Sequence, residues 1–256
     1  MHKPLIPWPG GKRRLAKHIL PIIHGTPHRT YVEPFAGGAA ILFMRNPAPV
    51  EVINDLHGEL VRLYRCVQHH LEELVRQYRW ALVSREMFRW AQLQHIDTLT
   101  DIQRAARFYY LQRLAFGGKV VGQNFGTSAT TPPRINWLRL EEELSQAHHR
   151  LARVTVENLP WQEVIRRYDK PETLFFLDPP YWQTSGYGND FGLEEHQQLA
   201  EAMATMQGKA LLTINDHPDM RRIYKRMAST PMQTSYTIGG THKAKEANEL
   251  LYRSWR

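Results

Sequence analysis

One stretch, Thr173-Leu-Phe-Phe-Leu-Asp178, limits the possible folds of this chain more than any other. It is nearly all apolar, which is the pattern of a central strand covered on both faces. Two consecutive prolines, Pro179 and Pro180, follow at once and remove two N–H donors, so neither strand nor helix can continue through them. We therefore expect the strand to end at Asp178, at the edge where open α/β sheets bind ligands.

Patterns of strand and helix alternate along the rest of the chain, and this predicts an α/β fold. A helix is expected over 193–206, and further strands are expected at 30–35, 50–55, 154–158, 209–214, 230–238 and 248–255. Residues 58–150 have helical periodicity and lack strand patterns outside a glycine-punctuated stretch. In that stretch Val120-Val121 and Asn124-Phe125 could form the arms of a short hairpin. The helical block is predicted to be an insertion between the second and third strands.

Several classes of protein are excluded by what the sequence lacks. There is no run of 18 apolar residues to span a membrane, and the first residues lack the apolar core of a signal peptide. The single cysteine, Cys66, excludes an internal disulfide framework and cysteine-based zinc sites. We expect a cytoplasmic protein of a prokaryotic cell or its phage, with no membrane partner.

Basic residues are segregated along the chain. The stretches 1–32, 102–140 and 220–245 each hold six lysines or arginines and no acidic residue, while the formal net charge of the whole chain is +8. The remainder of the chain is therefore acidic. If the three stretches converge in space, they form a positive face that suits DNA or RNA, although a solubilising surface would use the same residues.

A second motif lies at the first strand-to-helix turn, Glu33-Pro-Phe-Ala-Gly-Gly38. Glycines there let the backbone approach a ligand, and the start of a helix offers free N–H groups. Asp55 closes the next predicted strand, where an acid typically accepts hydrogen bonds from ribose hydroxyls. A tight structural turn would use the same residues, so this pattern alone leaves both interpretations open.

Asp178-Pro179-Pro180-Tyr181 is suited to chemistry on an exocyclic amino group. The lone pair of such a nitrogen is delocalised into the ring, and two acceptors on its two hydrogens would favour a pyramidal, nucleophilic nitrogen. The Asp178 carboxylate and the Pro179 carbonyl can be those acceptors, and Tyr181 can stack on the base. A methyl sulfonium bound at the glycine loop would complete the transfer. The 13 histidines form no H-E-x-x-H pattern, and we predict no metal site.

These motifs together resemble the Dam-like N6-adenine DNA methyltransferases, which use S-adenosylmethionine. The resemblance rests on Trp8-Pro-Gly-Gly-Lys12, Tyr31-Val-Glu-Pro-Phe-Ala-Gly-Gly38, Asn54-Asp55 and Asp178-Pro-Pro-Tyr181, and on their order. It implies a Rossmann-like class I methyltransferase sheet with an inserted, mainly helical target-recognition domain that carries a β-hairpin. The catalytic domain would comprise 1–57 and 152–256, and the recognition domain 58–151.

The resemblance also implies functional residues. Asp178, Pro179, Pro180 and Tyr181 would be catalytic. S-adenosylmethionine, and its product S-adenosylhomocysteine, would be bound by Trp8, Pro9, Gly10, Lys12, Glu33, Phe35, Ala36, Gly37, Gly38, Asp55, Asn158 and Asp178. The chain departs from the family pattern at Ala39, where many members have a third glycine. It departs again at Pro160, where many have an acid that contacts the cofactor adenine, and Asn158 or backbone groups would substitute.

Double-stranded DNA is the expected substrate. Lys119, Gln123 and Asn124 have the groups to read base edges, and Arg104, Arg107 and Arg134 would contact phosphates. We expect a site-specific enzyme that methylates N6 of a flipped adenine, as a monomer or weak dimer, and a restriction endonuclease is a candidate partner. The alternatives are cytosine N4 or RNA as substrate, glutamine methylation of a protein, and a DNA-binding relative without catalysis.

Overall fold

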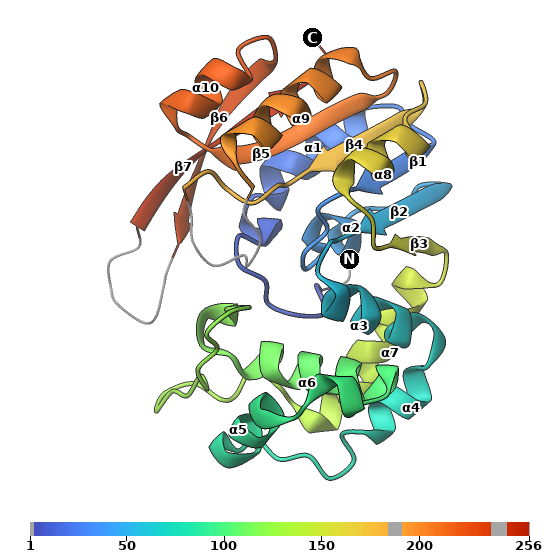
Figure 1. Cartoon of the computed structure of the whole chain (residues 1–256), viewed down its shortest axis with the longest axis vertical. Helices are drawn as coiled ribbons and strands as arrows, with labels where there is room; N and C mark the ends of the chain where they lie inside the picture. The colour runs from blue at the N-terminus through green and yellow to red at the C-terminus, as the bar shows by residue number, and fades with distance from the viewer. Residues whose placement is uncertain (1–2, 184–190, 237–244, 256) are drawn as a thin grey trace.

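A single mixed sheet of seven strands forms the centre of the protein (Figure 1). The computed structural model describes residues 3–183, 191–236 and 245–255, with the side chains of 234–236 and 245–247 left aside. The strand order is β3-β2-β1-β4-β5-β7-β6, in which β7 runs antiparallel to both of its neighbours and the first five strands are parallel. The strands are β1 (Thr30–Glu33), β2 (Val50–Asn54), β3 (Val154–Glu157), β4 (Thr173–Leu177), β5 (Lys209–Asn215), β6 (Ala228–Tyr236) and β7 (Lys245–Arg253). The predicted α/β class is confirmed.

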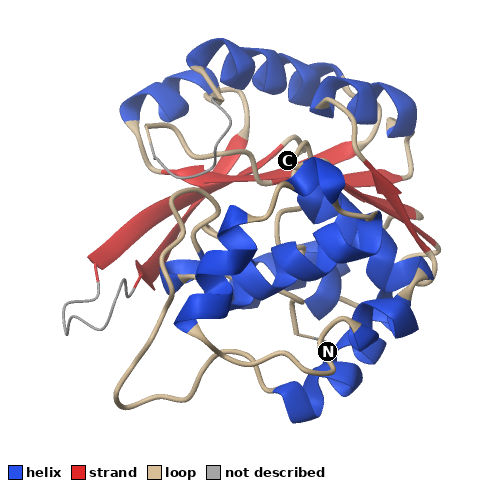
Figure 2. Ribbon diagram, turned by 60° about the horizontal axis from the view of Figure 1, so that its bottom comes forward, coloured by secondary structure: helices blue, strands red, loops and turns tan. Residues whose placement is uncertain are grey.

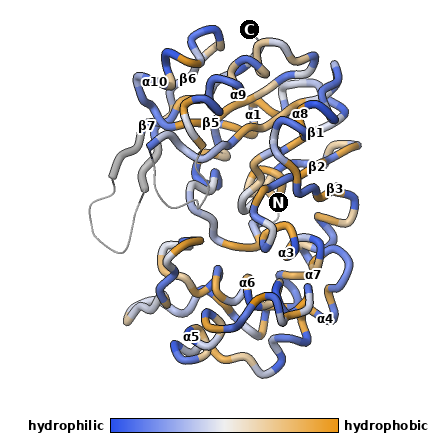
Figure 3. The backbone as a smooth tube through the Cα atoms, in the orientation of Figure 1, coloured by the Kyte–Doolittle hydropathy of each residue, from blue (hydrophilic) through white to orange (hydrophobic). Residues whose placement is uncertain are grey.

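Helices cover both faces of this sheet (Figure 2). One face is covered by α8 (Trp161–Tyr168), α9 (Leu193–Thr205) and α10 (Pro218–Ile223), and the other by α1 (Ala16–Gly25) and α2 (Ala40–Met44). Successive side chains of β4 alternate between the two cores, so that Phe175 packs on one face and Phe176 on the other. All five residues of β4 are buried, as its composition predicts, and the apolar colour of Figure 3 is concentrated in the central strands.

The helical block lies between β2 and β3 in the chain, as expected. It begins with α3 (Gly58–His69) and α4 (Leu71–Arg76), continues with α5 (Arg85–Leu93) and α6 (Asp101–Leu114), and ends with α7 (Leu140–Leu151). Thr100 and Gln103 form a reciprocal capping box that starts α6, and the Ser84 side chain caps α5. Short 3-10 turns occur at Lys12–Arg14, Ile96–Thr98, Phe116–Gly118 and Trp137–Arg139.

A buried ionic network fixes this block to the sheet. Arg150 of α7 donates from Nη2 to Glu51 Oε1 of β2 at 2.9 Å and to the carbonyl oxygen of Leu42 at 2.8 Å. Arg45 forms a second ion pair with the same carboxylate. Because both arginines and Glu51 are at most 7% exposed, removal of any partner would leave a buried charge uncompensated. The block is therefore held in one orientation toward the sheet.

One of the two predicted hairpin arms is wrong. Val120 and Val121 are not in a strand, and Phe125 of the other predicted arm forms an isolated antiparallel bridge with Ala115 instead. Gly117, Gly118 and Gly122 have φ values of 69°, 69° and 62°, which lie outside the extended region that a strand requires. The chain therefore forms a short closed loop in place of two pleated arms.

The strand order reverses between β1 and β4, which are neighbours in the sheet although their first residues are 143 positions apart in the sequence. Loops after two such strands turn to opposite faces, and the crevice between them is the usual ligand site of an open α/β sheet. No helix in the described ranges is long and apolar enough to cross a membrane.

Candidate active site

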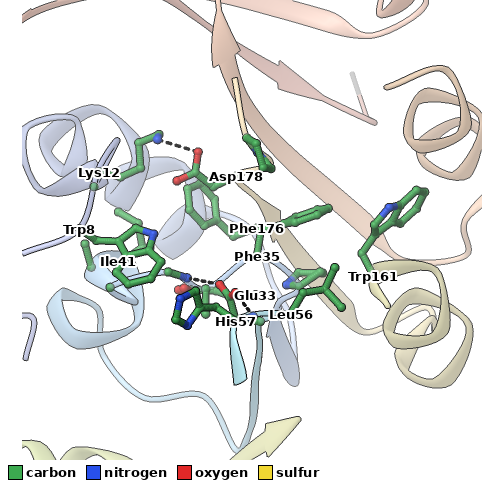
Figure 4. A pocket seen from close by; sticks show the side chains of 18 of the residues that line it. Trp8, Lys12, Glu33, Phe35, Ile41, Leu56, His57, Trp161, Phe176 and Asp178 are labelled. Carbon is green, nitrogen blue, oxygen red and sulfur yellow. Dashed lines mark hydrogen bonds and ion pairs between the residues drawn. The ribbon is translucent and has the colours of Figure 1, made fainter. Parts of the chain in front are cut away.

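A cleft lies at this reversal point, at the carboxyl ends of β1, β2 and β4 (Figure 4). It brings together residues that are far apart in the sequence. Eleven of the predicted site residues line it: Trp8, Pro9, Lys12, Glu33, Phe35, Ala36, Gly37, Gly38, Asp55, Asp178 and Pro180. The other four, Gly10, Asn158, Pro179 and Tyr181, are not among the lining residues.

The glycine loop has a conformation that only glycine accepts easily. Gly37 has φ of +47°, and a Cβ atom there would lie 2.6 Å from both Cδ1 and Nε1 of Trp8. The indole of Trp8 therefore lies directly on the loop. The Tyr64 hydroxyl of α3 donates to the carbonyl oxygen of Gly37 at 2.6 Å, which ties the helical block to the same loop. Ala39 is left-handed as well, with φ of 47°, so the loop adopts its turn without a third glycine.

Asp55 organises the loop from the end of β2. Its Oδ2 accepts a hydrogen bond from the Gly37 N–H at 2.8 Å, and its Oδ1 accepts one from the His57 N–H at 2.9 Å. Burial raises the pKa of Asp55, and the N–H donors of His57 and Gly37 act in the opposite direction. The carboxylate retains acceptor capacity toward the cleft because each oxygen has two lone pairs.

Asp178 and Lys12 form a buried ion pair at the other side of the cleft. Lys12 Nζ lies 2.6 Å from Asp178 Oδ1 and 2.5 Å from the carbonyl oxygen of Gly10, to which it donates. Thr213 of β5 donates its hydroxyl to Asp178 Oδ1 at 2.9 Å. Burial raises the pKa of Asp178 to about 6, and the ammonium of Lys12 is the largest opposing influence. The resemblance implies that Lys12 binds cofactor, and the structure places its ammonium in direct contact with the Asp178 carboxylate.

Acidic side chains predominate in the cleft. Glu33, Asp55, Asp178 and Glu195 line it together with one lysine, Lys12. Burial raises the pKa of Glu33 to about 7, and the hydroxyl of Tyr31, which donates to it at 2.8 Å, acts against that rise. An excess of carboxylates in a partly desolvated cleft favours a cationic ligand.

The two aromatic residues after the prolines are held by the sheet. The Tyr181 hydroxyl donates to the carboxylate of Glu249 on β7, and Lys12 Nζ lies 4.6 Å from the centre of the Tyr181 ring. The amide group of Asn215 exchanges hydrogen bonds with the backbone N–H and carbonyl of Trp182, both at 3.1 Å. Asn215 therefore supports the loop that follows the prolines.

Several lining residues carry no motif of their own. Leu56 and Trp161 line the cleft beside Phe35, and Figure 4 places these three at the end away from Lys12 and Asp178. Asn158 is exposed and donates to the carbonyl oxygen of Asp55 at 2.7 Å, so it supports the end of β2 from outside the cleft. Two features of the sequence could have identified these residues. Leu56 is an apolar residue directly after a predicted strand, and Trp161 is an aromatic residue that begins the helix after Pro160.

The residues predicted to bind DNA fall into two groups. Lys119, Asn124 and Arg134 are exposed. Arg104 forms an ion pair with Glu59, and the Arg107 guanidinium donates to the carbonyl oxygens of Ala91 and Gln92, so both arginines are engaged within the helical block. Gln123 is also bonded internally: its Nε2 donates to Gln112 Oε1 and to the carbonyl oxygen of Lys119, each at 2.9 Å.

Two further observations concern the single cysteine and possible metal ligands. Cys66 is buried in α3, and burial raises the pKa of its thiol to about 11, which makes it unreactive at neutral pH. In the described part of the chain no group of three histidine, cysteine or acidic side chains could hold a metal ion.

Comparison with known proteins identifies the family. Residues 8–238 match the D12 class N6 adenine-specific DNA methyltransferases, and the chain belongs to that family. It is 27% identical to the type II methyltransferase M.CviBI of Paramecium bursaria Chlorella virus NC1A, over 97% of this chain and 96% of that protein. It is 24% identical to the type II methyltransferase M1.LlaDCHI of Lactococcus lactis, over 95% and 92% of the two chains. Identity to the DNA adenine methylase of Haemophilus influenzae is 23%, over 87% and 83%.

Membership in this family confirms the predicted enzyme class, an adenine-specific DNA methyltransferase dependent on S-adenosylmethionine. The family comprises methyltransferases specific for N6 of adenine in DNA. Membership therefore argues against the alternative functions, which were methylation of cytosine N4, of RNA or of protein glutamine, and DNA binding without catalysis.

Proposed function

We propose that the cleft holds S-adenosylmethionine beside an adenine flipped out of duplex DNA, with Asp178 as the acceptor that activates the adenine amino group. The observation that carries this proposal is the ion pair of Asp178. Oδ1 already accepts from an N–H donor, Lys12 Nζ at 2.6 Å, inside the cleft that the glycine loop lines. A buried carboxylate that binds one nitrogen donor can bind a second, such as N6 of adenine.

Asp178 and the Pro179 carbonyl would each accept one hydrogen of N6. This arrangement disfavours the planar amino group and exposes its lone pair to the methyl donor. The bond between sulfur and methyl breaks as the bond between N6 and methyl forms, and the N6 proton held by Asp178 is released. Tyr181, fixed through its hydroxyl to Glu249, would stack on the base. No metal takes part in this scheme.

The lining of the cleft fits S-adenosylmethionine. When bound, this cofactor supplies a methyl group on a positively charged sulfur. Glu33 and Asp178 complement that charge, and Asp55 can accept hydrogen bonds from the ribose hydroxyls. Phe35 and Leu56 offer apolar surface against which the cofactor adenine can pack. These contacts would hold the adenine although position 160 is a proline in place of an acid.

Residues 58–151 would be the target-recognition domain, with 1–57 and 152–256 as the catalytic domain. We name residues 115–126 the recognition segment, because Lys119 and Asn124 are exposed on it and can donate to base edges. Arg134, exposed nearby in the sequence, would bind phosphate. A monomer or weak dimer acting on duplex DNA, with or without a restriction endonuclease partner, is consistent with this arrangement.

A methyl-transfer assay tests the proposed function. The purified chain is incubated with S-adenosylmethionine carrying a labelled methyl group and with duplex DNA of random sequence, single-stranded DNA, RNA or a mixture of proteins. Nucleosides and amino acids are then separated after digestion. We expect label in N6-methyladenine from duplex DNA, concentrated at one sequence. Label in N4-methylcytosine, in RNA or in glutamine, or none at all, would contradict the proposal.

A further inference from the structure

A buried glutamine of the helical block joins the recognition segment to the N-terminal residues that line the cleft. Gln112 of α6 is 0% exposed. Its Nε2 donates to the carbonyl oxygens of Pro7 at 2.8 Å and Gly118 at 2.6 Å, and its Oε1 accepts from Gln123 Nε2 at 2.9 Å. Both amide hydrogens and the amide oxygen are therefore used, two of the three bonds toward the recognition segment and one toward the N-terminal stretch.

The bond to Pro7 leads into the active site. Pro7 directly precedes Trp8, whose indole lies against Gly37 of the glycine loop. Four residues after Trp8 the same stretch supplies Lys12, whose ammonium binds Asp178. A displacement of the Pro7 carbonyl would therefore shift Trp8 against the glycine loop and Lys12 against Asp178.

The bond to Gly118 leads to the recognition segment. Gly118 has φ of +69°, and a Cβ atom there would lie 3.1 Å from Cβ of Pro7, so the turn packs directly on the N-terminal stretch. The segment is closed by the bridge between Ala115 and Phe125. Close packing at Gly118 and the hydrogen bonds of Gln112 are two independent connections between the same two parts of the molecule.

We propose that Gln112 is a positioning residue that couples recognition of the target sequence to cofactor binding. Gln112 binds the recognition segment through Gly118 and Gln123, and the N-terminal stretch through Pro7. Cognate DNA that fixes the recognition segment would therefore also fix Gln112 and Pro7. The stretch around Trp8 would then lose less conformational freedom when cofactor binds, and cofactor would bind more tightly.

The chain offers a matched control for this residue. Gln68 of α3 also donates from Nε2 to two carbonyl oxygens, those of Leu151 and Val154, each at 2.8 Å. These bonds join the helical block to the start of β3, away from the recognition segment. Gln68→Leu therefore removes the same kind of interaction without touching the proposed connection.

The experiment measures the affinity for S-adenosylhomocysteine by calorimetry, alone and in the presence of a saturating duplex. The duplex carries the site most methylated by the wild-type protein in a random pool, and a duplex with that site scrambled serves as reference. For the wild-type protein we expect the cognate duplex to tighten binding by about fivefold or more relative to the scrambled one. In Gln112→Leu this ratio should fall to about one, while Gln68→Leu should keep it.

Melting temperatures of wild type, Gln112→Leu and Gln68→Leu distinguish a specific loss of coupling from a general loss of stability. Both variants are expected to melt at lower temperature than wild type, because Gln112→Leu loses three hydrogen bonds and Gln68→Leu loses two. If Gln112→Leu does not fold, Gln112→Glu replaces it, since a carboxylate keeps the acceptor for Gln123 and loses both donors. The inference is overturned if wild type binds S-adenosylhomocysteine equally well with cognate and scrambled duplexes. It is also overturned if a folded Gln112 variant keeps the wild-type ratio of these two affinities.

The inference rests on the proposed function, and the two can fail separately. A wild-type protein that methylates no adenine in duplex DNA contradicts the proposed function. A protein that methylates its site normally, but whose affinity for S-adenosylhomocysteine is the same with cognate and scrambled duplexes, contradicts only the coupling by Gln112.

Discussion

Lys12→Met tests whether the ammonium beside Asp178 keeps the catalytic carboxylate ionised. Lys12 is 3% exposed and lies 2.6 Å from Asp178 Oδ1, so methionine would fill a similar volume and remove only the charge and its hydrogen bonds. Asp178 must be ionised to accept from the adenine amino group. Activity should therefore be lost as the pH falls through the pKa of Asp178, which is about 6 in the wild-type protein.

The size of the effect follows from this ion pair. An opposite charge at such a distance lowers the pKa of a carboxyl by about 1 to 3. Without Lys12 the pKa of Asp178 should rise from about 6 to between about 7 and 9. At pH 7 the ionised fraction would fall from about nine tenths to between about one half and one hundredth, so the rate should drop by about twofold to 100-fold.

The assay is kcat/KM for methylation of the cognate duplex between pH 5.5 and 9.5, at saturating S-adenosylmethionine. The variant should recover most of its activity at high pH, where Asp178 ionises without help. Lys17→Met is a suitable control, because Lys17 is an exposed lysine five residues away. An acid limb at the same pH in wild type and Lys12→Met would refute this reasoning. If Lys12 served only the cofactor, the variant would instead show weaker cofactor binding and an unchanged pH profile.

Three further predictions concern the ligand sites. Asp55→Ala should weaken binding of S-adenosylhomocysteine in calorimetry by about 1.5 to 3 kcal/mol, because ribose hydroxyls lose a charged acceptor; unchanged affinity would place the ribose elsewhere. Asn124→Ala should relax the sequence preference by about 1 to 3 kcal/mol in sequencing of methylated random duplexes. Arg134→Ala should weaken binding to all duplexes alike and reduce the salt dependence by about one unit of slope. Identical behaviour of these last two variants would contradict the division into base and phosphate contacts.

The parts of the fold that depend on local pattern could be predicted from the sequence. The buried strand at 173–177, and the two loops that meet at the reversal of strand order, follow from runs of apolar residues and from the prolines and glycines after them. The recognition segment could not be predicted, because the positive φ values of Gly117, Gly118 and Gly122 override the strand preference of Val120 and Val121.

The contacts that tune the site could not be predicted either, because they join residues distant in sequence. Lys12 and Asp178 lie 166 positions apart, and Tyr181 and Glu249 lie 68 apart. Arg104 carries the same charge whether it binds phosphate or Glu59, and only the packing of α6 on α3 decides between them. Composition can show that basic residues are present, but it cannot show which of them are already paired.

The most direct test of the central claim is the single-turnover rate of Asp178→Ala with cofactor and cognate duplex both bound. Loss of one preorganised contact to the reacting group typically lowers a rate by about 10²- to 10³-fold, and more where contacts act as a unit. We predict a loss of at least that size, with affinity for S-adenosylmethionine retained because the glycine loop and Asp55 remain. A rate within about tenfold of wild type would contradict the assignment of Asp178 as the acceptor that activates adenine N6.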